Sequence, residues 1–351
     1  MELLMAIYNY PLVAALVKAI AVIIPVVLGV AYLTLVERKV LGYMHVRLGP
    51  NRVGPYGLLQ PFADLLKMLF KEFVIPSAAN KKMFLVAPFI AITSAFAVWV
   101  VIPFGEGAFK EGSMLDSSVL YVLAIASLGV YASLIGGWAS NSKFAIFGAI
   151  RSAAQVISYE LAMGFALIAV IITAGSLNFT DIVLGQKGYG ILSWYFIPLF
   201  PVMIVYYISS LAELNRAPFA VVEGESEIVA GFFTEYSSTG FVSFYLAEYT
   251  NMILASALIT LLFFGGWLSP LSGFGLESVP VLGWLAHDGI IWMVLKIIFF
   301  LFSIIWVRAT FPGYRYDQIM RLGWKFFIPI TVIWLLVVVV MHQVNFGPWF
   351  S

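Results

Sequence analysis

Long apolar runs separated by polar segments dominate this chain. Each run approaches the roughly 20 residues that a helix needs to cross the hydrocarbon layer of a membrane. Because no water satisfies backbone groups there, such runs are expected to be helical. The pattern predicts eight membrane-spanning helices, at about Leu12–Val36, Met83–Ile102, Ser118–Trp138, Val156–Ala174, Ile191–Leu211, Tyr249–Trp267, Gly289–Val307 and Phe326–Met341.

The composition supports an all-α polytopic membrane protein, with residues 1–351 forming a single membrane domain. Of its 351 residues, 62% are hydrophobic and 11% are charged, which excludes a soluble globular domain. The first run lacks a basic segment before it and a small-residue cleavage site after it. It is therefore interpreted as a retained helix and not as a signal peptide.

Lys and Arg are distributed unequally between the polar segments. Fifteen lie in the segments after spans one, three, five and seven, whereas the segments after spans two, four and six hold only Lys110 and Lys187. Positive charge accumulates on the cytoplasmic side of a membrane. This distribution predicts that both termini lie outside and that the charged segments, where function is expected, face the cytoplasm.

The first cytoplasmic-side segment, residues 37–82, carries a second pattern. Apolar residues recur there at helical spacing, which predicts an amphipathic helix at about residues 57–73 lying in the membrane interface. Its apolar face either packs against the bundle or forms a doorway for a hydrophobic substrate at the level of the lipid. That face comprises Leu58, Leu59, Phe62, Leu65, Leu66, Leu69, Phe70 and Phe73, and the opposite face Gln60, Asp64, Lys67 and Lys71.

The cytoplasmic-side segment at residues 212–240 is acidic. Its stretch Glu213–Glu235 contains five carboxylates and one Arg, and Glu223, Glu225 and Glu227 alternate. Such a loop is either solvated or held within protein, where crowded carboxylates cannot all ionise and titrate as a coupled set that can pass protons. The apolar residues between the acids argue against a freely solvated loop.

Span four contains an unusual carboxylate. Glu160 lies within the apolar run, whereas Arg151, Gln155 and Ser158 share a helical face nearly opposite to it, at 100° per residue. Ionisable groups inside a membrane are costly and mark functional or paired sites. Glu160 is therefore interpreted as functional or as part of an ion pair.

Redox centres and metal sites are not expected in this chain. It has no Cys, so it can supply neither a thiolate iron–sulfur site nor a disulfide. The three His residues are far apart in the sequence, with no spacing typical of metal ligands. We assign no metal ligands and no catalytic residues to this chain.

Four long motifs, in order along nearly the whole chain, resemble one family. They span Leu35–Glu72, Gly137–Glu160, Ala212–Ser237 and Arg315–Lys325. They are similar to the membrane subunit of proton-pumping NADH:quinone oxidoreductase, respiratory complex I, that adjoins its hydrophilic arm. The resemblance implies a subunit of a translocase that links quinone reduction at the arm junction to proton translocation. It implies quinone as a shared substrate, with no FMN and no iron–sulfur cluster in this chain.

The resemblance also assigns roles to individual residues. The quinone path would involve Arg38, Phe62, Asp64, Arg216, Phe219 and Phe232. The proton path would involve Glu37, Glu160, Glu213, Glu223, Glu225, Glu227 and Glu248, supported by Arg151, Tyr159 and Tyr249. Two positions depart from the family pattern, Leu214 where Thr is usual and Ala220 where Asp is usual. An altered local field in the quinone chamber is the expected consequence of Ala220.

Partners and location follow from the same resemblance. The expected partners are hydrophilic-arm subunits that hold the terminal iron–sulfur cluster and the quinone headgroup site, small membrane subunits, antiporter-like subunits, quinone and lipid, with no nucleic acid. A bacterial plasma membrane is favoured over a mitochondrial inner membrane. Two alternatives are the related membrane anchor of an ion-translocating hydrogenase complex and a stand-alone transporter. The transporter is disfavoured because we find neither an internal repeat nor paired broken helices.

Overall fold

The computed structural model describes residues 11–105, 115–221, 228–273, 286–345 and 347–350. Regular structure in these ranges consists of helices and single turns of helix. The α-helices are α2 (Pro11–Met44), α3 (Gln60–Leu69), α4 (Lys81–Ala97), α5 (Ser118–Ala139), α6 (Lys143–Ala174), α7 (Phe179–Leu184), α8 (Phe200–Glu213), α10 (Ser238–Phe263), α12 (Ile290–Thr310), α13 (Tyr316–Leu322) and α14 (Ile328–Gln343). Short 3₁₀ turns occupy Pro55–Gly57, Val98–Val101, Gly190–Ser193 and Gly231–Phe233, and a π-helical turn occupies Gly323–Phe327.

The predicted class, an all-α polytopic membrane protein, is confirmed. Within the described ranges, seven helices are long and apolar enough to cross a membrane. They are α2, α4 with its 3₁₀ extension, α5, α6, α10, α12 and the continuous stretch from α13 to α14. The amphipathic helix predicted at about residues 57–73 is present as the shorter α3.

The predicted span Ile191–Leu211 was wrong in its length. Only Phe200–Glu213 is α-helical, and the residues from Trp194 to Leu199 form bends and turns. Pro198 and Pro201 account for this, because proline lacks an N–H and disfavours helical geometry in the residue before it. The 14-residue α8 rises about 21 Å, which is less than the roughly 30 Å of hydrocarbon that a full span must cross. The first, fourth and last spans were predicted too short, since α2, α6 and the last helix continue into polar sequence.

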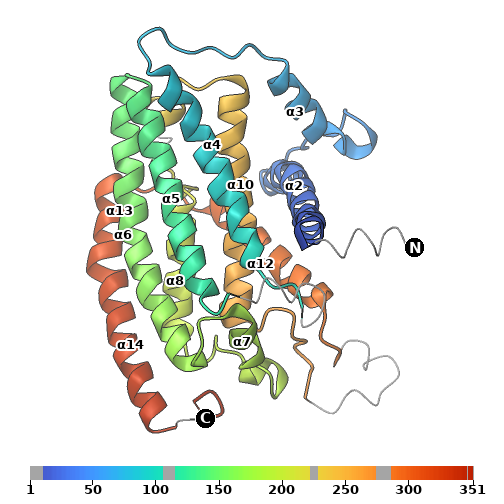
Figure 1. Ribbon diagram of the computed structural model, residues 1–351, viewed down its shortest axis with the longest axis vertical. Coiled ribbons are helices and arrows are strands. Elements are labelled where there is room, and N and C mark those ends of the chain that lie inside the picture. The colour runs from blue at the N-terminus through green and yellow to red at the C-terminus, as the bar shows by residue number, and fades with distance from the viewer. Residues whose placement is uncertain (1–10, 106–114, 222–227, 274–285, 346, 351) are drawn as a thin grey trace.

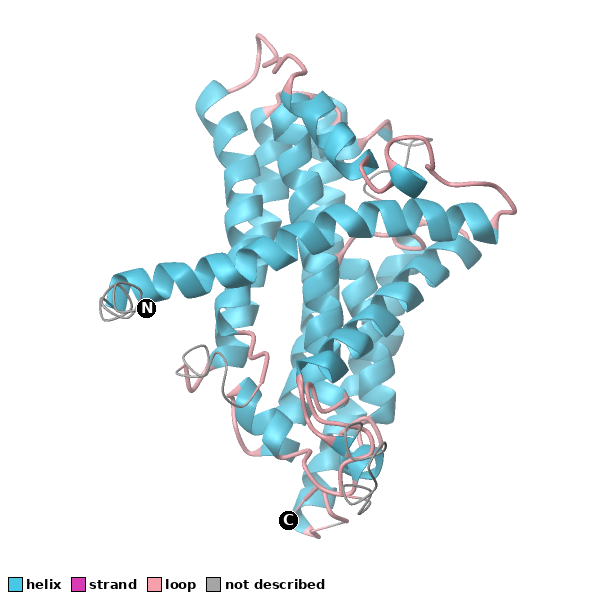
Figure 2. Ribbon diagram, turned by 90° about the vertical axis from the view of Figure 1, so that its right-hand side faces the viewer, coloured by secondary structure: helices cyan, strands magenta, loops and turns pink. Residues whose placement is uncertain are grey.

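The helices form an elongated bundle crossed by the first helix. α4, α5, α6, α8, α10 and α14 run along its long axis (Figure 1). α2 crosses these helices at a large angle to the long axis of the bundle (Figure 2). Its 34 residues rise about 51 Å, and a helix longer than the hydrocarbon is accommodated by tilt.

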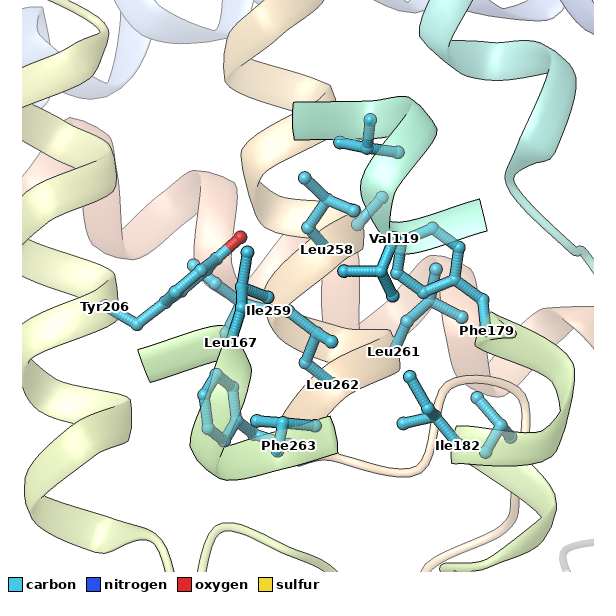
Figure 3. Packing of buried hydrophobic residues seen from close by; sticks show 14 of the residues in the cluster. Val119, Leu167, Phe179, Ile182, Tyr206, Leu258, Ile259, Leu261, Leu262 and Phe263 are labelled. Atoms are coloured by element: carbon cyan, nitrogen blue, oxygen red, sulfur yellow. The ribbon is translucent and has the colours of Figure 1, made fainter. Parts of the chain in front are cut away.

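Small residues allow close approach where α5 turns into α6. A Cβ added to Gly137 would lie 2.6 Å from the carbonyl oxygen of Ala145, and one added to Gly148 would lie 2.5 Å from the Cα of Gly231. Because lipid tails are as apolar as side chains, membrane helices associate through this close packing. At the other end of the bundle, large apolar side chains from α5, α6, α7, α8 and α10 fill the core (Figure 3).

A half-buried lysine completes the hydrogen bonding at the end of α10. Lys296 lies in α12, six residues after its first residue, Ile290. Its Nζ donates to the carbonyl oxygens of Phe264 at 2.7 Å, Gly266 at 3.0 Å and Leu268 at 2.8 Å. Its ammonium also lies 4.1 Å from the centroid of the Trp194 ring. The final carbonyl groups of a helix have no partner within the helix. Lys296 therefore supplies donors to carbonyl groups that the end of the helix leaves without partners.

Replacing this cation is expected to destabilise the protein. Lys296→Met keeps the length of the side chain but leaves three carbonyl groups without this donor, and an orphaned buried group costs about 1–3 kcal/mol. The melting temperature of the purified protein, followed by tryptophan fluorescence, should fall. The exposed Lys82 provides the control, and Lys82→Met should melt like the wild type. Equal melting of both variants would contradict a structural role for Lys296.

Candidate functional site: a buried ion cluster joined to an acid-lined cavity

A buried guanidinium, Arg216, lies at the centre of the candidate site. Its Nη1 is 2.7 Å from Oε1 of Glu37, and its Nε is 2.5 Å from Oε1 of Glu248. Its guanidinium carbon lies 4.3 Å from the centroid of the Tyr249 ring. Burial alone would lower the pKa of Arg216, but the carboxylates of Glu248 and Glu37 raise it above its usual range. Arg216 therefore stays charged and binds two carboxylates together.

Glu37 is the second centre of this cluster. Its Oε1 also contacts Nη1 of Arg308, and its Oε2 accepts a hydrogen bond of 2.6 Å from the hydroxyl of Tyr249. The Tyr249 hydroxyl lies 2.8 Å from that of Tyr245. Two carboxylates and two guanidinium groups thus balance each other in a largely buried site, as buried charges require.

Four separate parts of the chain contribute to this Arg216 cluster. Glu37 comes from α2, Arg216 from the loop after α8, Glu248 and Tyr249 from α10, and Arg308 from the last turn of α12. The contacts between Glu37 and Arg308 bridge 271 positions of sequence. Spacing in the sequence could not have shown that these groups meet.

A cavity of about 170 Å³ lies next to the cluster, between α4, α5, α6, α8 and α10. Three predicted proton-path residues line it, Glu160 from α6, Glu213 from the end of α8, and Glu248 from α10. Glu248 therefore belongs both to the cavity wall and to the Arg216 cluster. Asn215 and Asn251 also line the cavity near these acids.

Apolar residues line the cavity on both sides of its acids. On α10, Phe244 precedes Glu248 and Leu258 follows it, and on α6, Val156 precedes Glu160 and Leu167 follows it. The apolar lining includes Val98, Val119, Val122, Leu167, Phe179, Leu258 and Leu262. All seven belong to the packed core, and five of them, Val119, Leu167, Phe179, Leu258 and Leu262, are labelled in Figure 3. The carboxylates therefore lie in a cavity whose lining is largely apolar, beside close-packed hydrocarbon.

Three of the residues predicted for the quinone path, Arg38, Phe62 and Asp64, lie together at α2 and α3. Nη1 of Arg38 donates to Oδ2 of Asp64 at 2.7 Å, and Gln60 donates to the other oxygen of Asp64 at 2.9 Å. The Phe62 ring packs edge-on against Tyr32 of α2, with centroids 6.2 Å apart. Unlike the Arg216 cluster, this group is accessible, and Phe62 is 38% exposed.

Phe219 connects the Arg216 loop to α6. Its ring centroid lies 5.9 Å from that of Tyr159, and its carbonyl oxygen accepts a hydrogen bond of 3.0 Å from Gln155. Gln155 also donates to the carbonyl oxygen of Ala212. The face of α6 opposite Glu160, predicted from the sequence to carry Gln155, thus fixes both ends of the loop that carries Arg216.

Phe232 and Arg151 lie elsewhere. Phe232 lines the cavity and stacks in an aromatic group with Phe233 and Phe244. Arg151 lies over the ring of Tyr316, with its guanidinium carbon 5.8 Å from the ring centroid, and does not line the cavity. Glu223, Glu225 and Glu227 lie outside the described residues.

Two residues of the cluster were missed by the sequence analysis. Arg308 entered the sequence analysis only among the charges that predict the membrane topology. It ends span seven on the same predicted side of the membrane as Glu37, which indicated that the two side chains could pair. Tyr245 lies four residues before Tyr249, on the same helical face, which was a signal for a shared hydrogen bond. As for metals, no three His, Asp or Glu side chains of the described ranges are placed to hold an ion.

Comparisons with known proteins agree on one family. The family model described as NADH dehydrogenase matches residues 17–339. The chain is 56% identical over 338 residues to the H subunit of NADH-quinone oxidoreductase from Vesicomyosocius okutanii subsp. Calyptogena okutanii (strain HA), with 95% of this chain and 92% of that protein covered. It is 56% identical over 339 residues to the protein of the same name from Ruthia magnifica subsp. Calyptogena magnifica, with the same coverage.

Burial should determine how much each ion pair stabilises the protein. Arg216–Glu37 and Arg38–Asp64 have the same 2.7 Å distance, but the side chains are 6% and 3% exposed in the first pair and 47% and 30% in the second. Arg216→Met leaves two neighbouring carboxylates facing one guanidinium, and breaking a buried pair costs about 3–5 kcal/mol. Arg38→Met should cost about 0–1 kcal/mol.

Thermal unfolding of the two purified variants provides the measurement. The melting temperature should fall several times further for Arg216→Met than for Arg38→Met. Equal falls would mean that the Arg216 cluster does not contribute to stability through its burial.

Proposed function

This chain belongs to the NADH dehydrogenase family and is a multi-pass membrane subunit of NADH-quinone oxidoreductase, and we propose that it connects the quinone path to the proton path. The observation that carries this proposal is the position of Glu248. One of its oxygens pairs with Arg216, and the same side chain lines the cavity of Glu160 and Glu213. A change of charge at Arg216 therefore acts through Glu248 on the cavity carboxylates Glu160 and Glu213.

The coupling is electrostatic. Glu37 and Glu248 both bind Arg216, so a new negative charge near this guanidinium, such as one on a reduced quinone, competes with them for it. Weaker pairing of Glu248 with Arg216 raises the proton affinity of this carboxylate, because an opposite charge nearby favours the ionised form. Glu248 then takes up a proton, and the repulsion between the cavity carboxylates falls, so the three acids titrate as one coupled set.

The cavity can support proton transfer between these acids. A cavity needs about 10–15 Å³ to hold one water molecule, so about 170 Å³ has room for a short chain of water. Polar groups near the acids, including Asn215, Asn251 and Ser210, offer hydrogen bonds to such water.

The proposed quinone path begins at α3. The apolar side of α3 is exposed at Phe62, Leu65, Leu66 and Leu69, as expected for a helix in the membrane interface. The Arg38–Asp64 pair borders this surface, and Phe219 and Phe232 lie deeper, toward Arg216 and the cavity. A hydrophobic quinone tail would contact the apolar side of α3, with the headgroup carried toward the neighbouring hydrophilic arm.

Quinone is the substrate in this proposal, and the redox groups belong to partner subunits. The expected partners are the hydrophilic-arm subunits with the terminal iron–sulfur cluster, small membrane subunits and antiporter-like subunits. We propose a bacterial plasma membrane location, with the Arg216 cluster on the cytoplasmic side and both termini outside. Glu223, Glu225 and Glu227 continue the proton path in this proposal. Arg151 and Tyr159 are supporting residues on α6 that do not line the cavity.

Removing one cavity carboxylate tests the proposal. Glu213→Gln should impair quinone-linked NADH oxidation and proton pumping by the complex in membrane vesicles, because the coupled set loses a titrating member. NADH oxidation by artificial electron acceptors should be unchanged, since that reaction does not use this subunit. The control is Glu72→Gln, which neutralises an exposed carboxylate outside the cavity. Wild-type pumping by Glu213→Gln would remove Glu213 from the path.

Ala220→Asp tests the altered field of the quinone chamber. Ala220 follows Phe219 in the loop of Arg216, and an added carboxylate there should change the KM for quinone modestly without abolishing pumping. Steady-state kinetics with a short-chain quinone provide the measurement, and Ala220→Asn is the uncharged control. Collapse of turnover with Asp but not with Asn would mean that this loop excludes a negative charge.

A further inference from the structure

The last membrane helix departs from α-helical geometry at one place. Between α13 and α14, Gly323–Phe327 form a π-helical turn within an otherwise continuous helix. A π turn accommodates one residue more than an α-helix does, is rare, and occurs mostly where function requires it.

The π turn and the helical turn before it contact two consecutive residues of α6. Nε1 of Trp324 donates to Oγ of Ser158 at 3.1 Å, and the hydroxyl of Tyr159 donates to the carbonyl oxygen of Ile319 at 2.9 Å. The Phe327 ring packs edge-on against the Tyr159 ring at 6.0 Å. Gly323 faces the same ring, since a Cβ added there would lie 3.7 Å from it.

The next residue of α6 is Glu160. Successive side chains of a helix are separated by 100°, so Ser158 and Tyr159 face the last helix while Glu160 lines the cavity. Both contacts therefore act on the back of the helical turn that carries Glu160. The other ionisable groups on the cavity wall are Glu213 and Tyr206 from α8 and Glu248 from α10.

Tyr159 also links this contact to the Arg216 loop. Its ring packs against Phe219, and Phe219 in turn packs against Tyr314, which lies two residues before the start of α13. The backbone N–H of Tyr314 donates to the carbonyl oxygen of Pro218 at 3.0 Å. The last helix thus holds the loop of Arg216 at one end and the back of Glu160 at the π turn.

We propose that the π turn sets the position of Glu160 in the cavity, with Trp324 as a positioning residue that acts through Ser158. The extra residue of the turn brings the Trp324 indole onto α6, and an unbroken α-helix would carry it away by a fraction of a turn. This inference rests on the proposed role of Glu160 in proton transfer. Trp324 itself touches neither the substrate nor the cavity.

The matched pair Trp324→Phe and Trp334→Phe tests this proposal in the intact complex. Trp334 lies in α14, and its Nε1 donates to the carbonyl oxygen of Pro198 at 3.1 Å. Both variants therefore remove one indole N–H donor from the same helix while keeping an aromatic ring, but only Trp324 contacts the back of Glu160. The readout is the pH profile of quinone-linked NADH oxidation and of proton pumping, with artificial acceptors as the check on assembly.

Trp324→Phe should shift the pH of half-maximal quinone-linked turnover by about half a unit or more, since moving Glu160 relative to Glu213 and Glu248 changes their coupled titration. Trp334→Phe should keep the wild-type pH profile, even where both variants melt at a lower temperature. Deleting the exposed Lys325 restores an α-helical count of residues, and it should shift the profile further.

Two outcomes separate this inference from the function on which it rests. If Glu160→Gln impairs pumping while Trp324→Phe keeps the pH profile of Trp334→Phe, the positioning role is wrong and the role of Glu160 stands. If Glu160→Gln pumps like the wild type, the proton-path assignment of Glu160 fails by itself.

Discussion

The buried guanidinium of Arg216 is the interaction on which the rest of the site depends. It joins Glu37 of α2 to Glu248 of α10 from a loop that follows α8, and Arg308 of α12 meets the same Glu37. In a membrane protein, charged groups of this kind are expensive unless they are paired. Their mutual pairing therefore holds a steeply inclined helix against the bundle at one point and places Glu248 at the cavity.

The helices are interrupted where polar side chains can satisfy the backbone. At the end of α10, Lys296 binds three carbonyl groups, and Gln186 donates to the carbonyl oxygens of Leu261 and Leu262 while accepting from the N–H groups of Tyr195 and Gly265. Non-helical backbone at membrane depth is tolerated only where protein or water supplies such partners. The turn before α8 is therefore compatible with a bilayer despite the shortness of that helix.

The site combines two environments that differ in polarity. The group of Arg38, Phe62 and Asp64 is accessible at the surface, whereas Glu160 and Glu213 lie in a cavity lined largely by apolar side chains. The Arg216 cluster lies next to this cavity and shares Glu248 with it. One side chain, Glu248, therefore joins the Arg216 cluster to the cavity of the other two carboxylates.

The sequence by itself determined the helical membrane class, the amphipathic α3 and the face of α6 that carries Gln155 and Ser158, because hydrophobic length and helical periodicity are local properties. It also identified the acids by their cost in an apolar run. Only the tertiary structure decided which acids meet: Glu160, Glu213 and Glu248 share a cavity, Glu37 pairs with Arg216 and Arg308, and Arg151 faces Tyr316. These contacts join positions far apart in the chain, and their geometry depends on helix tilt, on proline-bounded ends and on a single π turn, none of which hydrophobic periodicity encodes.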